Sequence, residues 1–133
     1  TNIAGSIGLA QLKKIDMLQD RRKKIWDIYQ NEFKNVNWIK NPLDAENGDR
    51  HSYFTYCIKV PERDRLANFL LENGIYTTLR YHPLHLNPIF KSTNLCLKNS
   101  EALNKRGLNI PLHPRLTDAD VDKVIQKIKA FDI

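Results

Sequence analysis

The sequence has few of the residues that define several protein classes, and each shortage excludes one of them. Only two cysteines, Cys57 and Cys96, occur in 133 residues. That is too few for a disulfide scaffold, and their spacing does not fit a metal knuckle, so both are predicted to be reduced thiols. No apolar run approaches the roughly 18 residues of a membrane span, and no charged and apolar leader with a cleavage site is present. We therefore expect a cytoplasmic protein with no membrane partner.

The composition is that of a folded domain. Hydrophobic residues make up 41% and charged residues 27% of the chain, and there are only 5 glycines, which excludes disordered and collagen-like classes. A chain of this length forms one domain and buries roughly two thirds of its unfolded surface. The net charge of +6 favours anionic partners such as phosphates or nucleic acid without choosing among them.

The first third of the chain carries an apolar stripe. Apolar and small residues recur in steps of three or four from Gly8 to Phe33, which predicts one long amphipathic helix over about residues 2–35. The chain starts at Thr1 with this pattern already in place, so we expect it to be cut from a longer protein. The stripe is also longer than a small domain can cover, which indicates a missing domain or subunit.

The remaining sequence predicts a small sheet with helices around it. β-branched and aromatic alternation indicates strands at residues 52–60, 75–81 and 108–112. Helices are predicted from Pro61 to a stop at Gly74, over residues 100–106, and from Thr117, where Asp120 completes a capping box. The predicted fold class is α/β (α+β), a three-stranded sheet covered by helices. Residues 1–133 would form one domain, with the sheet-and-helix unit over about residues 50–133.

One polar cluster stands out as a candidate site. Arg80, Tyr81, His82 and His85 fall in an irregular segment after the second predicted strand, and His113 lies on a later loop. An arginine and a phenol can hold an anionic or sugar-like group, and imidazoles can shuttle protons. The structural alternative is that Tyr81 and His82 end the strand while His85 satisfies loop carbonyls. The residues alone leave both interpretations open.

Other chemistries are disfavoured. Pro83 breaks helical spacing between His82 and His85 and no carboxylate is close in sequence, so no metal site is predicted. Neither cysteine has an adjacent base. The basic run 21–24 lies on a predicted exposed helix face without interleaved aromatics, so we expect no nucleic-acid partner.

Four segments together resemble the C-terminal part of the pyridoxal-phosphate-dependent sugar aminotransferases of the DegT/DnrJ/EryC1/StrS family. They lie in the family's order and span nearly the whole chain: IGLAQL at 7–12, Tyr53 to Pro61 with RDRL at 63–66, GIYTTLRYHPLHL at 74–86, and IPLHPRLT at 110–117. The resemblance implies the small domain of a fold-type-I aminotransferase. The whole enzyme would be a homodimer that transfers an amino group from glutamate to a nucleotide-linked keto-sugar.

The resemblance also implies where the chemistry lies. The lysine that forms the Schiff base with pyridoxal phosphate would belong to a large N-terminal domain absent from this chain, so the chain alone would be inactive. His85 of the PLHL segment is the first candidate for a substrate contact, with Tyr81 and His82 next and Arg80 after them. The alternative left open is a stand-alone, non-catalytic module that binds a nucleotide sugar or a partner subunit.

Overall fold

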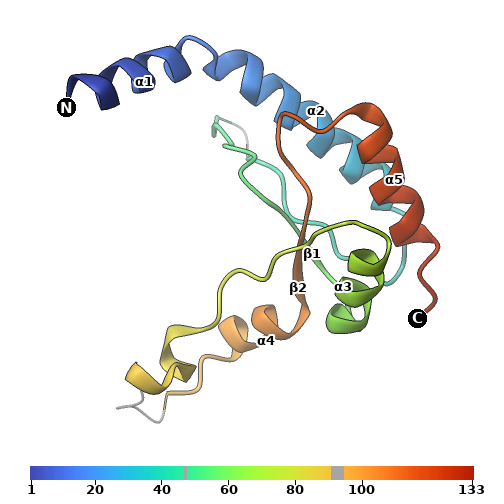
Figure 1. Ribbon diagram of the computed structural model, residues 1–133. Helices are drawn as coiled ribbons and strands as arrows, with labels where there is room; N and C mark the ends of the chain where they lie inside the picture. The colour runs from blue at the N-terminus through green and yellow to red at the C-terminus, as the bar shows by residue number, and fades with distance from the viewer. Residues whose placement is uncertain (47, 91–94) are drawn as a thin grey trace.

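The computed structural model describes residues 1–46, 48–90 and 95–133. It is a mixed α/β arrangement, which confirms the predicted fold class (Figure 1). The elements in chain order are α1 (Asn2–Leu12), α2 (Ile15–Phe33), β1 (Tyr56–Lys59), α3 (Arg63–Glu72), the 3-10 turns η1 (Leu84–Leu86) and η2 (Pro88–Phe90), α4 (Lys98–Arg106), β2 (Gly107–Ile110) and α5 (Asp118–Lys129).

The sheet has two strands among the described residues, so the prediction of three was wrong. β1 and β2 are antiparallel, with Tyr56 opposite Ile110. The predicted middle strand, 75–81, contributes only the single bridge between Thr78 and Asn109. Of its residues only Ile75 is buried, so the segment lacks the alternating burial that stabilises longer pairing.

Both real strands are shorter than predicted, for local backbone reasons. Tyr53 has φ +47°, a left-handed conformation that interrupts extension before β1. Pro111 has no N–H to donate, and β2 ends just before it. The chain on the outer side of β1 adds one further bridge, between Lys40 and Lys59.

The predicted long helix is interrupted, so that prediction was also wrong in part. α1 ends at Leu12, and α2 begins at Ile15 after a turn at Lys13 and Lys14. Lys14 has φ −108° and ψ 0°, and its N–H bonds to the Gln11 carbonyl three residues back. α1 buries no side chain in this chain. No tertiary packing of α1 therefore stabilises a continuous helix across Lys13 and Lys14.

Two helix ends lie where the sequence signals placed them. Thr117 and Asp120 form the predicted capping box at the start of α5. Gly74 ends the α3 region with φ +72°, a conformation that favours glycine.

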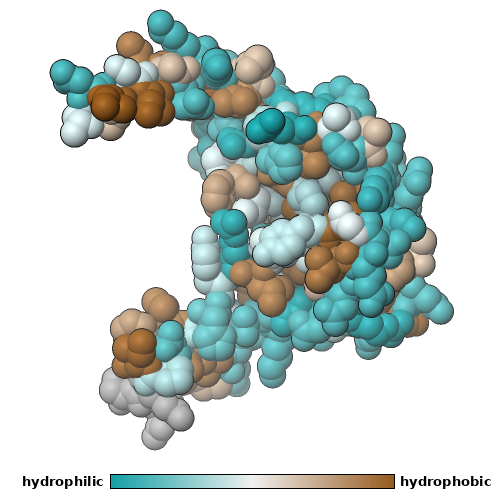
Figure 2. All heavy atoms as spheres, in the orientation of Figure 1, coloured by the Kyte–Doolittle hydropathy of each residue, from teal (hydrophilic) through white to brown (hydrophobic). Residues whose placement is uncertain are grey.

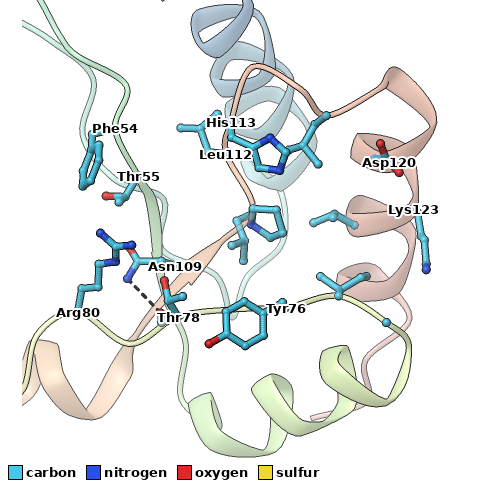
Figure 3. Close-up of a pocket in the computed structure, with 16 residues that line it drawn as sticks. Phe54, Thr55, Tyr76, Thr78, Arg80, Asn109, Leu112, His113, Asp120 and Lys123 are labelled. Carbon is cyan, nitrogen blue, oxygen red and sulfur yellow. Dashed lines mark hydrogen bonds between the residues drawn. The ribbon is translucent and has the colours of Figure 1, made fainter. Parts of the chain in front are cut away.

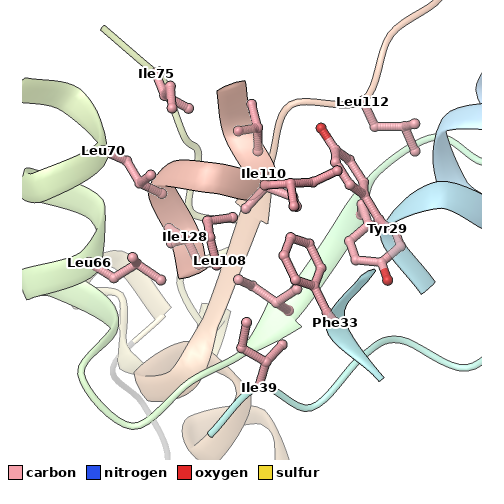
Figure 4. Packing of buried hydrophobic residues seen from close by; sticks show 14 of the residues in the cluster. Tyr29, Phe33, Ile39, Leu66, Leu70, Ile75, Leu108, Ile110, Leu112 and Ile128 are labelled. Atoms are coloured by element: carbon pink, nitrogen blue, oxygen red, sulfur yellow. The ribbon is translucent and has the colours of Figure 1, made fainter. Parts of the chain in front are cut away.

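The core lies between the β1–β2 pair and the inner faces of α2, α3 and α5 (Figure 4). Tyr29 and Phe33 of α2 pack from one side, while Leu66 and Leu70 of α3 pack from another. Leu108 lies between them on β2 and is fully buried.

Two arms project from this core and expose apolar side chains (Figures 1 and 2). We call residues 1–18 the helical arm and residues 84–90 with 95–97 the turn arm. The exposed large apolar residues are Ile3, Ile7, Leu9, Leu12, Ile15 and Met17 on the helical arm, and Leu84, Leu86, Ile89, Phe90, Leu95 and Leu97 on the turn arm. No helix within the described residues has both the length and the hydropathy of a membrane span.

The neighbours Leu70 and Leu71 test the packing directly. Both lie in α3, but Leu70 is 0% exposed and Leu71 is 58% exposed. We expect Leu70→Ala to lower the free energy of unfolding by about 2–5 kcal/mol. Leu71→Ala changes helix propensity equally and should stay within about 0.5 kcal/mol. Equilibrium urea unfolding measures both, and equal losses would contradict this core.

Candidate functional site

A cavity of about 410 Å³ opens where residues 75–80, the end of β2 and α5 meet (Figure 3). We call it the sheet-end cavity. Its size is within the range of small-molecule sites. Its polar side chains come from four different parts of the chain: Thr55, Tyr76, Thr78, Arg80, Asn109, His113, Asp120 and Lys123.

The floor of the cavity is fixed by the bridge between Thr78 and Asn109. Their backbones exchange hydrogen bonds of 3.1 and 2.9 Å. The Asn109 Nδ2 also donates to the Thr78 carbonyl at 3.1 Å (Figure 3). Asn109 is the one buried polar residue among those described, with 5% exposure. A buried amide with satisfied hydrogen bonds holds this backbone crossing rigidly.

Arg80 lies at one rim of the cavity, close to the aromatic rings of Phe54 and Tyr81. Its guanidinium lies 5.4 Å from the Phe54 ring centroid and 5.9 Å from that of Tyr81. Its Nη1 lies 3.4 Å from the Tyr81 hydroxyl. Among the described residues no carboxylate forms an ion pair with it. The guanidinium is therefore available to an anionic ligand.

The opposite wall carries His113, Asp120 and Lys123 (Figure 3). The Asp120 carboxylate accepts from the Thr117 hydroxyl at 2.7 Å and from the Thr117 N–H at 2.9 Å. These two hydrogen bonds, the side-chain one foremost, lower the pKa of Asp120. Asp120 therefore stays ionised as a helix cap, in keeping with the structural role predicted for it.

The predicted site residues do not all meet. Arg80 lines the sheet-end cavity together with His113. Tyr81, which is 76% exposed, and His82 lie beyond its rim and do not line it. Their predicted substrate contacts remain predictions.

His85 lies on the turn arm and is held by α4. Its Nε2 is 3.0 Å from the Glu101 Oε1, and its side chain is 7% exposed. Glu101 also accepts from the Leu97 N–H at 2.9 Å. Hydrogen bonding from His85, and then from Leu97, lowers the pKa of Glu101. His85 thus joins η1 to α4, and its substrate contact also remains a prediction.

Sequence reasoning missed Thr55, Tyr76 and Asn109 as cavity residues. Only Asn109 carried a signal, since it is a polar residue inside the apolar run 108–112. Thr55 and Tyr76 line the cavity because distant segments pack together, which the periodicity of the sequence does not encode.

The basic run 21–24 is largely engaged inside the chain. Arg21 pairs with Asp118 at 2.7 Å, and Lys24 approaches the same carboxylate at 3.5 Å. Lys23 pairs with Asp27 at 2.7 Å. The two contacts with Asp118 join α2 to the start of α5, whereas the Lys23–Asp27 pair lies within α2.

Within residues 1–46, 48–90 and 95–133 no group of three or more potential metal ligands occurs. Burial raises the pKa of the half-buried Cys57 thiol, which makes it a poor nucleophile.

The His85–Glu101 pair predicts a pH-dependent contribution to stability. A carboxyl with a lowered folded pKa stabilises the fold above its ordinary value of 4.5 and loses that effect as the pH falls through the folded value. The difference in unfolding free energy between the wild type and Glu101→Gln should be present at about pH 6 and vanish well below pH 4.5. Urea unfolding across this range measures it, with Glu72→Gln as the matched loss of one exposed carboxylate. A pH-independent difference would contradict the pairing.

Comparison with known proteins identifies the fold. Residues 1–129 match the DegT/DnrJ/EryC1/StrS aminotransferase family. A dTDP-4-dehydro-2,3,6-trideoxy-D-glucose 4-aminotransferase of Saccharopolyspora spinosa is 34% identical over 130 residues, 96% of this chain and 34% of that protein. The crystal structure of the aminotransferase TlmJ from Streptoalloteichus hindustanus has a TM-score of 0.93 at 33% identity, covering 96% of this chain and 35% of that one.

A third comparison concerns the cofactor. The PLP-form of Spr1654 from Streptococcus pneumoniae, described as a sugar aminotransferase, has a TM-score of 0.86 at 27% identity and covers 99% of this chain and 37% of that one. The chain therefore spans about a third of the length of the relatives it matches. The family match covers all four segments whose resemblance the sequence suggested and confirms it. The chain belongs to the DegT/DnrJ/EryC1/StrS aminotransferase family.

Proposed function

We propose that this chain is the C-terminal part of an enzyme that transfers an amino group from glutamate to the keto group of a nucleotide-linked sugar. The Arg80 guanidinium is the observation that supports this substrate class. It has no carboxylate partner among the described residues. It lies at the rim of a cavity lined with hydroxyl and amide groups. A guanidinium binds phosphate with directed hydrogen bonds, and hydroxyls and amides suit a sugar. The S. spinosa relative, whose name gives a dTDP-linked sugar as its substrate, supports the same class.

In this proposal Arg80 binds the diphosphate of the substrate. The hydroxyls of Thr55, Thr78 and Tyr76 face the sugar part of the ligand. Tyr81, His82 and His85 extend the same surface along the turn arm. His85 contributes through the loop that Glu101 holds in place.

The described residues do not themselves suit pyridoxal phosphate. That cofactor needs a lysine amine for its aldehyde and an acidic partner at its ring nitrogen. Within the sheet-end cavity only Lys123 and Asp120 have these groups, and the Asp120 carboxylate already caps α5 through Thr117. We therefore assign the cofactor and its lysine to a large domain upstream of Thr1. On this proposal the chain alone does not transaminate.

The two arms support a larger assembly. A folded monomer rarely leaves so many large apolar side chains exposed on two projections unless another surface covers them. We propose that the upstream domain and a second subunit of a cytoplasmic homodimer cover the helical arm and the turn arm (Figure 2).

Arg80 provides the test of the substrate assignment. In the longer enzyme, Arg80→Gln should raise KM for the nucleotide sugar by about tenfold or more, because a charge-assisted contact to phosphate is lost. The half-reaction with glutamate should be unchanged, because in this proposal Arg80 contacts only the diphosphate, which glutamate lacks. Steady-state and half-reaction kinetics measure both effects.

Arg115→Gln is the matched control. Arg115 is an exposed arginine of the same region that does not line the cavity, and its replacement should leave both half-reactions unchanged. The substrate assignment would be wrong if Arg80→Gln slowed the two half-reactions equally. It would also be wrong if Arg80→Gln slowed neither of them.

A further inference from the structure

A second cavity, of about 470 Å³, lies on the other edge of the sheet and shares no lining residue with the sheet-end cavity. We call it the lysine–arginine cavity. It is formed by residues 37–40, the end of β1 and one face of α4. Its charged lining residues are Lys40, Lys59 and Arg106, all positive, and no carboxylate lines it.

Backbone pairing places the two lysines directly opposite each other. Lys40 and Lys59 are bridge partners that exchange both backbone hydrogen bonds, each 2.9 Å long. Residues paired in this way project their side chains to the same side of the sheet, with Cβ atoms about 5 Å apart. Two like charges directly opposite each other destabilise a sheet unless something neutralises them.

The backbone of Arg106, the third cation, is held next to the same strand. The Arg106 carbonyl accepts from the Val60 N–H at 2.9 Å. Its neighbour Gly107 pairs with Lys59 in the β1–β2 register. Within the described residues, none of the three cations forms an ion pair. No described carboxylate therefore neutralises these three cations.

The rest of the lining suits an organic anion. Asn37 and Asn99 add amide groups. Trp38 and Leu103 form an apolar wall. The centroid of the Trp38 ring lies 6.0 Å from that of the Phe131 ring. Three cations lining one cavity match the charge of a diphosphate group better than that of a monovalent carboxylate.

We propose that the lysine–arginine cavity binds a diphosphate-bearing anion, with the diphosphate between Lys40, Lys59 and Arg106. An attached base lies against the Trp38 and Leu103 wall. This site does not depend on the proposed aminotransferase function, because it uses none of the residues assigned to that substrate.

The test is a titration of the chain with inorganic pyrophosphate and, separately, with UDP, followed by calorimetry and tryptophan fluorescence. Saturable binding of both is expected, and it should weaken as the salt concentration rises. Lys59→Gln and Arg106→Gln should each weaken pyrophosphate binding about tenfold, since each removes one charge-assisted contact. Trp38→Phe should weaken binding of UDP but not of pyrophosphate, which separates the base from the diphosphate.

Lys105→Gln is the matched control, because Lys105 is an exposed cation of α4 that does not line the cavity. It removes the same net charge and should change the affinity by less than twofold. Without ligand, Lys59→Gln should melt at the same or a higher temperature than the wild type, because it relieves the repulsion with Lys40. Equal weakening by Lys105→Gln, or no saturable binding, would overturn the proposal. The proposal would also be overturned if Arg80→Gln were the one variant to lose pyrophosphate binding. That result would assign the anion to the sheet-end cavity.

Discussion

The four-residue antiparallel pairing of β1 with β2 is the interaction on which the other features depend. On one side, β2 presents Asn109, whose backbone and amide both hold Thr78 and so bring Arg80 to the sheet-end cavity. On the other side, β1 presents Lys59, whose backbone holds Lys40 beside it. The apolar side chains of the same strands fill the core against α2, α3 and α5. One short ladder therefore positions two polar cavities and the packing between them.

The core and the two arms differ in how they treat their apolar side chains. The core closes around the sheet with fully buried aromatic and aliphatic residues, including Trp26 and Tyr56. The helical arm and the turn arm leave their apolar faces exposed. The family relatives are about three times as long as this chain, which is in keeping with surfaces shaped for contacts beyond residues 1–133.

Local signals predicted much of the fold. The capping box of Thr117 and Asp120 and the stop at Gly74 appear where residue type alone placed them, because each depends on a few neighbouring atoms. No residue type marked the positive φ of Tyr53, which makes β1 shorter than predicted. Likewise, none marked the turn at Lys14, which divides the predicted first helix. The three-strand sheet was predicted because residues 75–81 have strand-forming residue types, although only Thr78 pairs.

The candidate site was less predictable than the fold, because its residues come together through contacts between segments that are distant in the sequence. Arg80 and His113 were singled out by residue type, and their shared cavity follows from a bridge between residues 31 positions apart. The partnership of His85 with Glu101 spans 16 positions and is equally absent from local pattern. Contacts of this kind depend on how segments pack, and a single sequence does not specify that directly.

We propose that residues 1–133 form one part of a longer sugar aminotransferase. The intact mass of the native gene product tests this, after capture from its source cells with an antibody against this chain and treatment with borohydride. We expect a protein about three times heavier than 15.5 kDa, with pyridoxal phosphate fixed on a lysine outside residues 1–133. A product of 15.5 kDa without that adduct would rule this out and favour a stand-alone binding module.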